Sequence, residues 1–498
     1  MKKEESLTNR AFTGTLYLIS SGGVQVVLKI GVLAVLARFV TPAEFGLMGI
    51  AIVILDFSKL LSQLGIGPCI VQRKELETRH LTTGFSLSLL VGIFFSILLW
   101  TTAPVWERFF RMDGLIEILR TVTLVFFVNS ITITGLALLQ RNMNFKLIAS
   151  IEVLSYAFGY GAVGIVMAYQ GYGVWALVIG NISQAVLAAT LYLIYQPFPK
   201  RISIEIKAVR ELLYFGFGFT IAKIGNFLAT QGDNLVVGRT LGAGALGIYG
   251  RAYNFMVMPS SLFGNALDRS LFPAMAKVQD DKKKLAKAFL TGISMIALIA
   301  IPISVCFVIL APEFILILLG NNWVAVILPF QILAGSLLFR MSYKMSDSLA
   351  RATNAVYRRA WRQIIYALAV FLGSYIGHFW GLGGVATGVA SALIINFLLM
   401  AQLSIRITGI SWRDLLKAHR HGFLLGIVTT ICCLLLATVC RQTQAPHLVT
   451  LIGTVTGVSL FLGLVLWIYP QHFIRDDQKL LINRLVLKPF KKVIAQAA

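Results

Sequence analysis

Long apolar runs alternate with short polar segments along the whole of this 498-residue chain. Most runs are close to 20 residues long, the length that an α-helix needs to cross a hydrocarbon core of ~30 Å. The pattern therefore predicts an all-α polytopic membrane protein with about 14 transmembrane helices. The predicted spans are 13–37, 45–69, 81–103, 115–138, 149–169, 173–195, 211–237, 244–270, 286–310, 324–349, 360–379, 383–404, 420–440 and 447–469.

The first twelve spans form an internal repeat. Val35–Ala51 recurs 201 positions later as Val236–Ala252, and the matches include Arg38 with Arg239 and Gly46 with Gly247. At an offset of 210, Tyr156 likewise matches Tyr366. Six spans are an even number, so the two halves have the same orientation, a plan known among transporters. The predicted parts are an N-lobe at 1–195, a cytoplasmic connector at 196–210, a C-lobe at 211–404, two extra spans within 405–470 and a basic cytoplasmic tail at 471–498.

Composition and charge narrow the class of protein further. Hydrophobic residues make up 57% of the chain and charged residues only 13%, where about a quarter is usual for soluble domains. The net charge of +23 comes from short basic loops: 31 Lys and Arg occupy alternate loops, and five occupy the loops between them. This asymmetry predicts a multi-pass membrane protein with cytoplasmic N- and C-termini. It also argues against a nucleic-acid partner, which would need a basic face on a soluble domain.

No pattern in the sequence indicates an enzyme. The five cysteines contain no Cys-x-x-Cys pair, the six histidines are scattered, and no phosphate-binding loop of the Gly-x-x-x-x-Gly-Lys type occurs. The loops are too short to house a catalytic domain. We therefore expect no catalytic residue, no metal site and no cofactor.

Ionisable residues within predicted spans are the candidate functional groups, because each costs about 2.5–3.5 kcal/mol to insert. An electropositive interior suits a large anionic head group, since Arg and Lys are the usual phosphate-binding side chains. The predicted substrate-binding residues are Lys29, Lys223, Arg251, Arg340 and Lys344, and the residues predicted to orient the substrate or couple an ion are Asp56, Lys59, Asp233 and Asp347.

A structural explanation stays open for part of this set. Asp56 and Lys59 are three residues apart on a helix, as are Lys344 and Asp347, so each pair could neutralise itself and serve only helix packing. Lys29, Lys223 and Arg340 have no such local partner in the sequence.

Several segments resemble the lipid-linked polysaccharide flippases of the multidrug/oligosaccharidyl-lipid/polysaccharide exporter superfamily. The resemblance is to the colanic-acid and O-antigen exporter type and covers nearly the whole chain. The segments that carry it are Ala34–Arg38, Glu44–Gly46, Gly65–Gly67, Gln72–Lys74, Gly238–Asn254 and Leu271–Asp281.

The resemblance implies a flippase that moves undecaprenyl-diphosphate-linked oligosaccharides across the inner membrane by alternating access. It also implies two lobes around a central cationic cavity. The implied partners are the lipid carrier, membrane lipids, and a polysaccharide polymerase with its chain-length machinery. Two alternatives remain: an ion-coupled multidrug exporter of the same superfamily, and a non-transporting scaffold of a polysaccharide assembly complex. The surplus of positive charge argues against the first, because a cationic drug needs an acidic cavity.

Overall fold

The computed structural model describes residues 7–62, 65–73, 75–199 and 201–468. The side chains of 7–22, 208, 210–226, 265–270 and 274 also lie outside the description. The predicted basic tail at 471–498 therefore falls outside the described residues. The described part of the chain contains helices and turns but no strand, which confirms the all-α prediction. Each predicted span falls on one or more of these helices.

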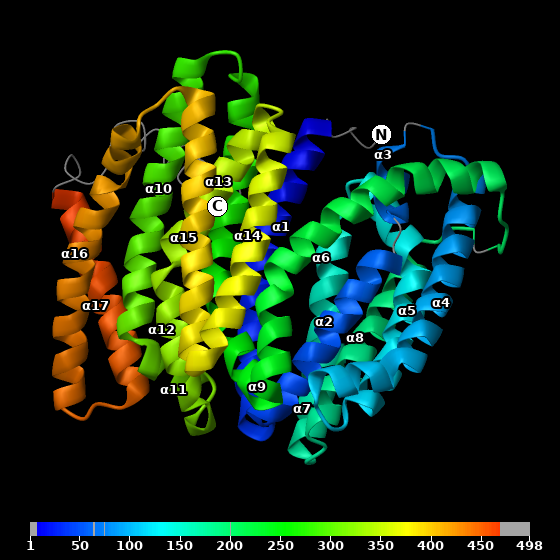
Figure 1. Cartoon of the computed structure of the whole chain (residues 1–498), viewed down its shortest axis with the longest axis horizontal. Coiled ribbons are helices and arrows are strands. Elements are labelled where there is room, and N and C mark those ends of the chain that lie inside the picture. The colour runs from blue at the N-terminus through cyan, green and yellow to red at the C-terminus, as the bar shows by residue number, and fades with distance from the viewer. Residues whose placement is uncertain (1–6, 63–64, 74, 200, 469–498) are drawn as a thin grey trace, which may run out of the picture. The chain divides into compact units, whose positions relative to one another are not determined.

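The chain forms two compact units. The first comprises residues 1–251, 318–323 and 374–385. Its helices are α1 (Leu7–Phe39), α2 (Pro42–Ser62), α3 (Ile66–Gln72), α4 (Thr78–Phe110), α5 (Leu115–Arg141), α6 (Phe145–Leu154), the π-helix η1 (Ser155–Ala162), α7 (Val163–Tyr169), α8 (Val174–Tyr195) and the first part of α9 (Ile206–Lys277) (Figure 1). Here α5 packs against α2, α4 and α8, and α1 packs against α6 and α7.

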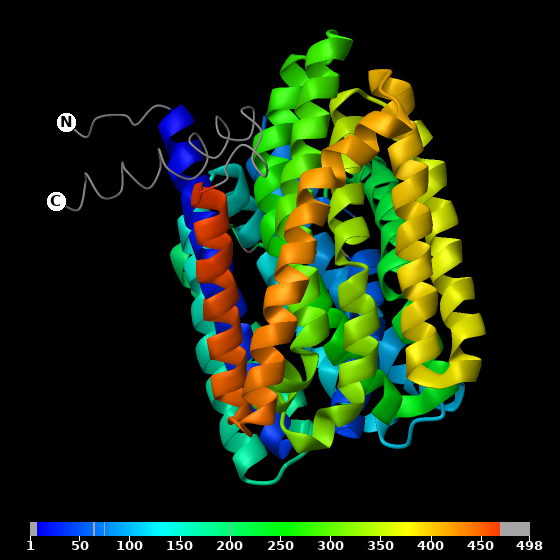
Figure 2. The ribbon, with the colours of Figure 1, turned by 90° about the vertical axis from the view of Figure 1, so that its left-hand side faces the viewer.

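The second unit comprises residues 252–317, 324–373 and 386–498. Its helices are the last part of α9, α10 (Lys282–Ile309), α11 (Ala311–Leu318), α12 (Ile327–Gly335), α13 (Leu337–Ala352), most of α14 (Val356–Gly377), most of α15 (Gly381–Thr408), α16 (Trp412–Gln442) and α17 (His447–Ile468). The 3₁₀ turn η3 (His378–Trp380) and the first half of the 3₁₀ turn η2 (Asn321–Val326) belong to the first unit. Helix α10 packs against α12, α13 and α16, and α17 lies beside α16 (Figure 2).

Helix α9 contains two predicted spans, 211–237 and 244–270. The chain turns between them at Gly242, whose φ of 85° and ψ of −177° are not helical. Positive φ costs glycine little because it has no Cβ, so this residue allows two spans to follow each other without a loop.

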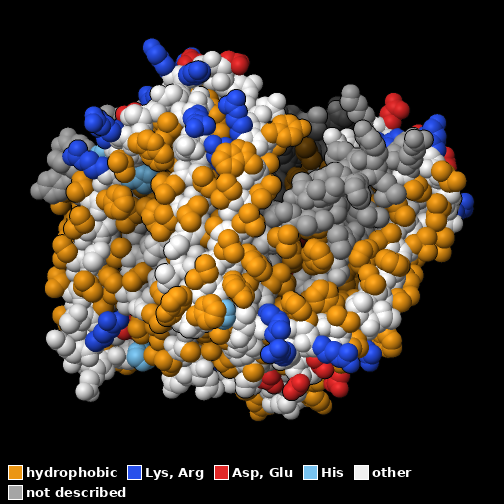
Figure 3. All heavy atoms as spheres, in the orientation of Figure 1, with side chains coloured by type: hydrophobic (Ala, Val, Ile, Leu, Met, Phe, Trp, Pro, Cys, Tyr) orange, Lys and Arg blue, Asp and Glu red, His pale blue; other side chains and the backbone are white. Residues whose placement is uncertain are grey.

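Apolar side chains cover the flanks of the helices, and Lys and Arg gather near the helix ends (Figure 3). On α16, α17 and α14, for example, Leu435, Leu460 and Leu368 are 62%, 76% and 56% exposed. Such exposure is costly in water but suits hydrocarbon. Among the described residues, eight helices are long and apolar enough to cross a membrane, or nine if the bent pair Asn321–Gly335 and Leu337–Ala352 counts as one span. The protein is thus a multi-pass membrane protein, while the number fourteen stays a prediction.

Polar caps and ion pairs hold the ends of several helices. Asp281 caps α10 by accepting hydrogen bonds from the backbone N–H groups of Lys283 and Lys284, both at 3.1 Å. The Lys284 backbone N–H and its ammonium lower the pKa of the Asp281 carboxyl. On α11, burial raises the pKa of Glu313, but hydrogen bonds from Arg441 at 2.7 and 2.9 Å, a backbone hydrogen bond and the charges of Arg441 and His447 together outweigh burial and leave this pKa below its ordinary value. These contacts tie α11 to the end of α16.

Candidate functional site

The repeated corner brings its two copies together within the first unit. A Cβ added to Gly46 would lie 1.7 Å from the carbonyl oxygen of Ala243, and one added to Gly247 would lie 1.8 Å from the carbonyl oxygen of Pro42. Residues 46 and 247 are repeat mates, as are 42 and 243, so the two contacts are related by the repeat. Glycine is required at both positions because the backbones approach too closely for any side chain.

Two buried polar contacts brace this region. The Tyr249 hydroxyl donates a 2.7 Å hydrogen bond to the carboxylate of Asp233, and the two residues are 0% and 1% exposed. They lie on opposite sides of the Gly242 turn, so the bond joins the two halves of the α9 corner. Trp323 is fully buried and donates a 3.0 Å bond to the carbonyl of Ala37. The structure therefore supports a packing role for Asp233.

In the first unit, a cation lies among aromatic rings contributed by two helices, α2 and η1. The Arg251 guanidinium lies 4.5 Å from the centre of the Phe45 ring and within electrostatic range of Tyr156 and Tyr160. The two tyrosine rings stack at 5.2 Å, and the Lys29 ammonium lies 5.8 Å from the Tyr156 ring centre. Both tyrosines belong to the π-helix η1, a rare form that is frequent at functional sites. Two predicted residues, Lys29 and Arg251, thus meet at one aromatic surface.

The second unit holds a similar arrangement around Arg340 on α13. Arg340 is only 8% exposed, donates a 3.2 Å hydrogen bond to the Tyr253 hydroxyl, and lies 5.2 Å from the centre of that ring. Tyr343 and Tyr366 are also within electrostatic range of its guanidinium, with their rings 6.3 Å apart. Tyr366 is the repeat mate of Tyr156. The duplicated tyrosine therefore lies within electrostatic range of an arginine in each unit, the half-buried Arg251 in the first and the buried Arg340 in the second.

Neither arginine is neutralised within the part of the chain that the structure describes. No described carboxylate pairs with Arg251 or Arg340, and the Nε atom of each is buried without a described hydrogen-bond partner. A buried guanidinium retains unused donors in a fixed fork, which matches the oxygen atoms of a phosphate. These two positions are the strongest anion-binding candidates.

The spacing of Lys344 and Asp347 suggested that they pair with each other, but each contacts other residues in the structure. The Lys344 ammonium donates a 2.9 Å bond to the carbonyl of Ser260. Asp347 accepts from Arg351 at 3.2 Å and from Arg359. Asp347 thus joins the end of α13 to the start of α14, which is a structural role.

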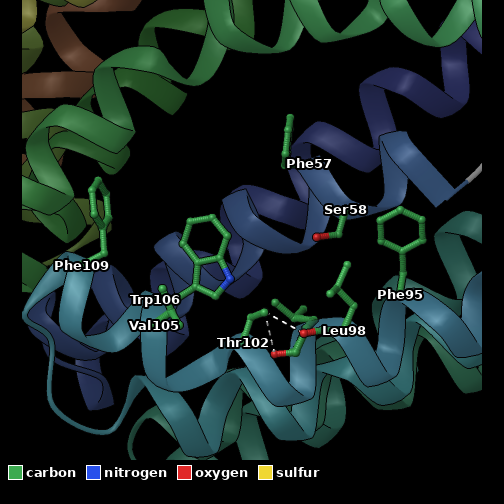
Figure 4. A pocket seen from close by; sticks show the side chains of 9 residues that line it. Phe57, Ser58, Phe95, Leu98, Thr102, Val105, Trp106 and Phe109 are labelled. Carbon is green, nitrogen blue, oxygen red and sulfur yellow. Dashed lines mark hydrogen bonds between the residues drawn. The ribbon is translucent and has the colours of Figure 1, made fainter.

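Asp56 and Lys59 do form the predicted pair on α2, with 3.8 Å between the ammonium and the carboxylate. The side chains are 46% and 29% exposed, so the pair is not sequestered. The two residues that separate Asp56 from Lys59 in the sequence, Phe57 and Ser58, help to line an apolar pocket of about 340 Å³ formed by α2 and α4. Figure 4 shows Phe95, Trp106 and Phe109 projecting from α4 around it. This lining suits hydrocarbon rather than phosphate.

Sequence reasoning found the cations but missed the aromatic residues around them. Of the predicted set, only Lys223 has its side chain outside the described residues. The missed residues are Phe45, Tyr156, Tyr160, Tyr253, Tyr343 and Tyr366. The match of Tyr156 with Tyr366 could have indicated these aromatic residues. Most residues in a predicted span are apolar, so a tyrosine that recurs at the same place in both halves stands out.

The fold is shared with solved transporters. The inward closed lipid II flippase MurJ superposes with a TM-score of 0.71 at 15% identity, over 92% of this chain and 99% of that chain. An inward-facing multidrug resistance MATE transporter of the MOP superfamily gives a TM-score of 0.61 at 17% identity, over 80% and 96%. The molecule is therefore a polytopic helical protein with the fold of the MOP-superfamily transporters.

Comparison with sequence relatives shows which family of proteins with this fold the chain belongs to. Residues 35–328, more than half of the chain, match the family model described as polysaccharide biosynthesis protein, and the chain belongs to that family. The lipopolysaccharide biosynthesis protein WzxC of Escherichia coli K12 is 28% identical over 84% of each chain. The teichuronic acid biosynthesis protein TuaB of Bacillus subtilis 168 is 25% identical, over 79% of this chain and 82% of its own. The predicted resemblance to polysaccharide exporters is confirmed.

Proposed function

We propose that this protein is a flippase that carries undecaprenyl-diphosphate-linked oligosaccharides across the cell inner membrane by alternating access, for surface polysaccharide synthesis. Membership of the polysaccharide biosynthesis family supports the substrate class, and the shared fold supports transport. The N- and C-termini would be cytoplasmic, and a polymerase with its chain-length machinery would act on the product. The proposed lobes are 1–195 and 211–404.

The observation that carries the proposal is the buried, tyrosine-surrounded Arg340, with Arg251 as its counterpart in the other unit. A charged group in a membrane span persists only with a partner or a function. The Tyr253 hydroxyl accepts one hydrogen bond from Arg340, and the buried Nε of each arginine has no described partner. Each of these donors can bond a diphosphate oxygen, and the neighbouring rings can pack on sugar or prenyl groups.

The roles proposed for the set follow from these surroundings. Arg251 and Arg340 bind the diphosphate or acidic sugars, and Lys29, Lys223 and Lys344 add positive charge. Asp56 with Lys59 is the remaining pair for orientation or ion coupling. Asp233 and Asp347, which were predicted for that role, are engaged in helix-end contacts.

A complementation assay tests the proposal. In a strain lacking the gene, Arg340→Gln and Arg251→Gln should each reduce surface polysaccharide at least tenfold at equal protein level, while the exposed Arg413→Gln should match wild type. Lys29, Lys223 and Lys344 changed singly to Ala should give smaller losses. Purified wild type in liposomes should flip a lipid-linked oligosaccharide. Full export by both arginine variants would refute the phosphate-binding assignment, and absence of flipping under an ion gradient and potential would favour a scaffold.

A further inference from the structure

A second cationic cluster lies at the ends of helices α10, α13, α14 and α15 in the second unit. A pocket of about 480 Å³ is bounded by Lys282 at the start of α10, Asn354 after α13, Arg358 in the first turn of α14 and Arg406 in the last turn of α15. All these segments belong to loops that the charge pattern predicts to be cytoplasmic. No acidic residue lines the pocket.

The basic groups here repel one another. Arg362, one turn beyond Arg358, is only 2% exposed, and both Arg358 and Arg406 lie within electrostatic range of it. Its guanidinium donates to the carbonyl oxygens of Leu399, at 3.0 Å, and of Arg358. Backbone carbonyls satisfy hydrogen bonds but do not cancel charge, so the cluster keeps a positive surplus.

The carboxylates on the neighbouring helix ends are engaged elsewhere. Asp281, next to Lys282, caps α10 and pairs with Lys284 at 3.1 Å. Asp347 pairs with Arg351 and Arg359. The positive end of the α14 dipole adds to the field, because the pocket includes the first turn of this 22-residue helix. Three cationic groups line the pocket and Arg362 lies behind them, so the pocket favours an anion.

The surface below the pocket indicates which anion. Tyr357 lines the pocket and is 91% exposed, and Trp361 follows one turn later at 45%. Ile364, Leu368 and Leu372 continue along the same face of α14 at 61%, 56% and 53%. Aromatic residues at this depth are typical of the membrane interface, and the apolar stripe beyond them suits an acyl chain.

We propose that this pocket binds the phosphate of an anionic phospholipid of the cytoplasmic leaflet, whose acyl chains lie along the exposed face of α14. Basic pockets between helix ends on that side of a membrane are the usual form of such sites. Arg358 and Arg406 would grip the phosphate as bidentate donors, and Lys282 would add a third charge. The site is independent of the transported substrate.

The test measures lipid binding to the full-length protein. Wild type in neutral detergent is titrated with phosphatidylglycerol or phosphatidylcholine, and binding is read from native mass spectra and from the shift in melting temperature. We expect phosphatidylglycerol to bind at least tenfold more tightly than phosphatidylcholine. Arg358→Gln/Arg406→Gln should remove this preference, and Arg413→Gln, an exposed change at the start of α16, should retain it.

Other outcomes overturn the proposal. Equal affinity for both lipids, or an equal loss with Arg413→Gln, would mean general attraction to a basic surface. Binding of inorganic pyrophosphate that is lost in the double variant, without a lipid preference, would assign the pocket to a soluble anion. If the double variant does not fold, Lys282→Gln serves instead, because this side chain is exposed and should weaken phosphatidylglycerol binding about threefold.

Discussion

The reciprocal glycine contact of the repeated corner gives the sharpest stability prediction. In Gly247→Ala the new methyl group would lie 1.8 Å from the Pro42 carbonyl oxygen, whereas ordinary contact starts near 3.4 Å. The two segments must therefore separate by about 1.6 Å. Both contacting groups are attached to backbone, so no side chain can rotate away. Gly46→Ala meets the carbonyl oxygen of Ala243 at 1.7 Å and should behave alike.

The expected loss follows from two opposing terms. Overpacking of a well-packed interior costs about 1–3 kcal/mol, and a clash between backbones belongs at the upper end. Replacing glycine by alanine within a helix returns up to about 1 kcal/mol. The net loss in free energy of unfolding is about 2 kcal/mol. For a unit of about 250 residues, this corresponds to a fall of roughly 4–8 °C in melting temperature.

Thermal unfolding of purified protein in detergent checks this value, and Gly250→Ala is the matched control. Gly250 lies on the same helix and also repeats an earlier glycine, Gly49, but a Cβ there meets no atom within 4 Å. It should melt at or slightly above the wild-type temperature. If Gly46→Ala and Gly247→Ala melt with the control, the corners do not touch as described. The double variant should lose less than the sum, because separating the corners relieves both clashes.

Three further predictions concern polar contacts. Arg441→Gln should destabilise the protein by about 1–3 kcal/mol, more than Glu313→Gln, because it strands a carboxylate that is 4% exposed. Since the folded-state pKa of Glu313 is lowered, its stabilising effect should be full above about pH 4.5 and disappear as acid protonates the folded carboxyl, so the melting temperatures of wild type and Glu313→Gln should converge only at low pH. Asp233→Asn should lower the melting temperature without reducing export per folded molecule, as measured by complementation at equal protein level. A loss of export without a loss of stability would instead indicate that Asp233 contributes to substrate binding.

Much of this architecture could be predicted from the order of residues. The length and spacing of apolar runs predict membrane helices because hydrocarbon forces each backbone polar group to bond within its own helix. The alternation of basic loops predicts orientation, and matching residues at constant offsets reveal the duplication. The order of residues also shows which ionisable side chains lie within predicted spans, and their insertion cost makes them candidates for function.

Which of those charges are free to bind a ligand depended on contacts between distant residues. Lys344 and Asp347 have spacing that suits a pair, but folding brings Ser260 to the first and Arg359 to the second. Helical spacing defines which neighbours are within reach on one helix and says nothing of other helices. The carboxylate of Asp233, a predicted orienting residue, accepts a hydrogen bond from Tyr249 across the corner, a contact that the sequence does not reveal.

For both the repeated corner and the candidate site, the sequence determines one part of the description and the tertiary structure determines the other. The sequence alone determined that Gly46 and Gly247 are equivalent and that Tyr156 and Tyr366 are equivalent, because duplication leaves its record in the order of residues. Only the tertiary structure decided that the two glycines face the opposite corner, and that each tyrosine lies within electrostatic range of an arginine. The physical reason is that packing of helices distant in sequence sets these contacts, through backbone distances and burial that no single helical period encodes.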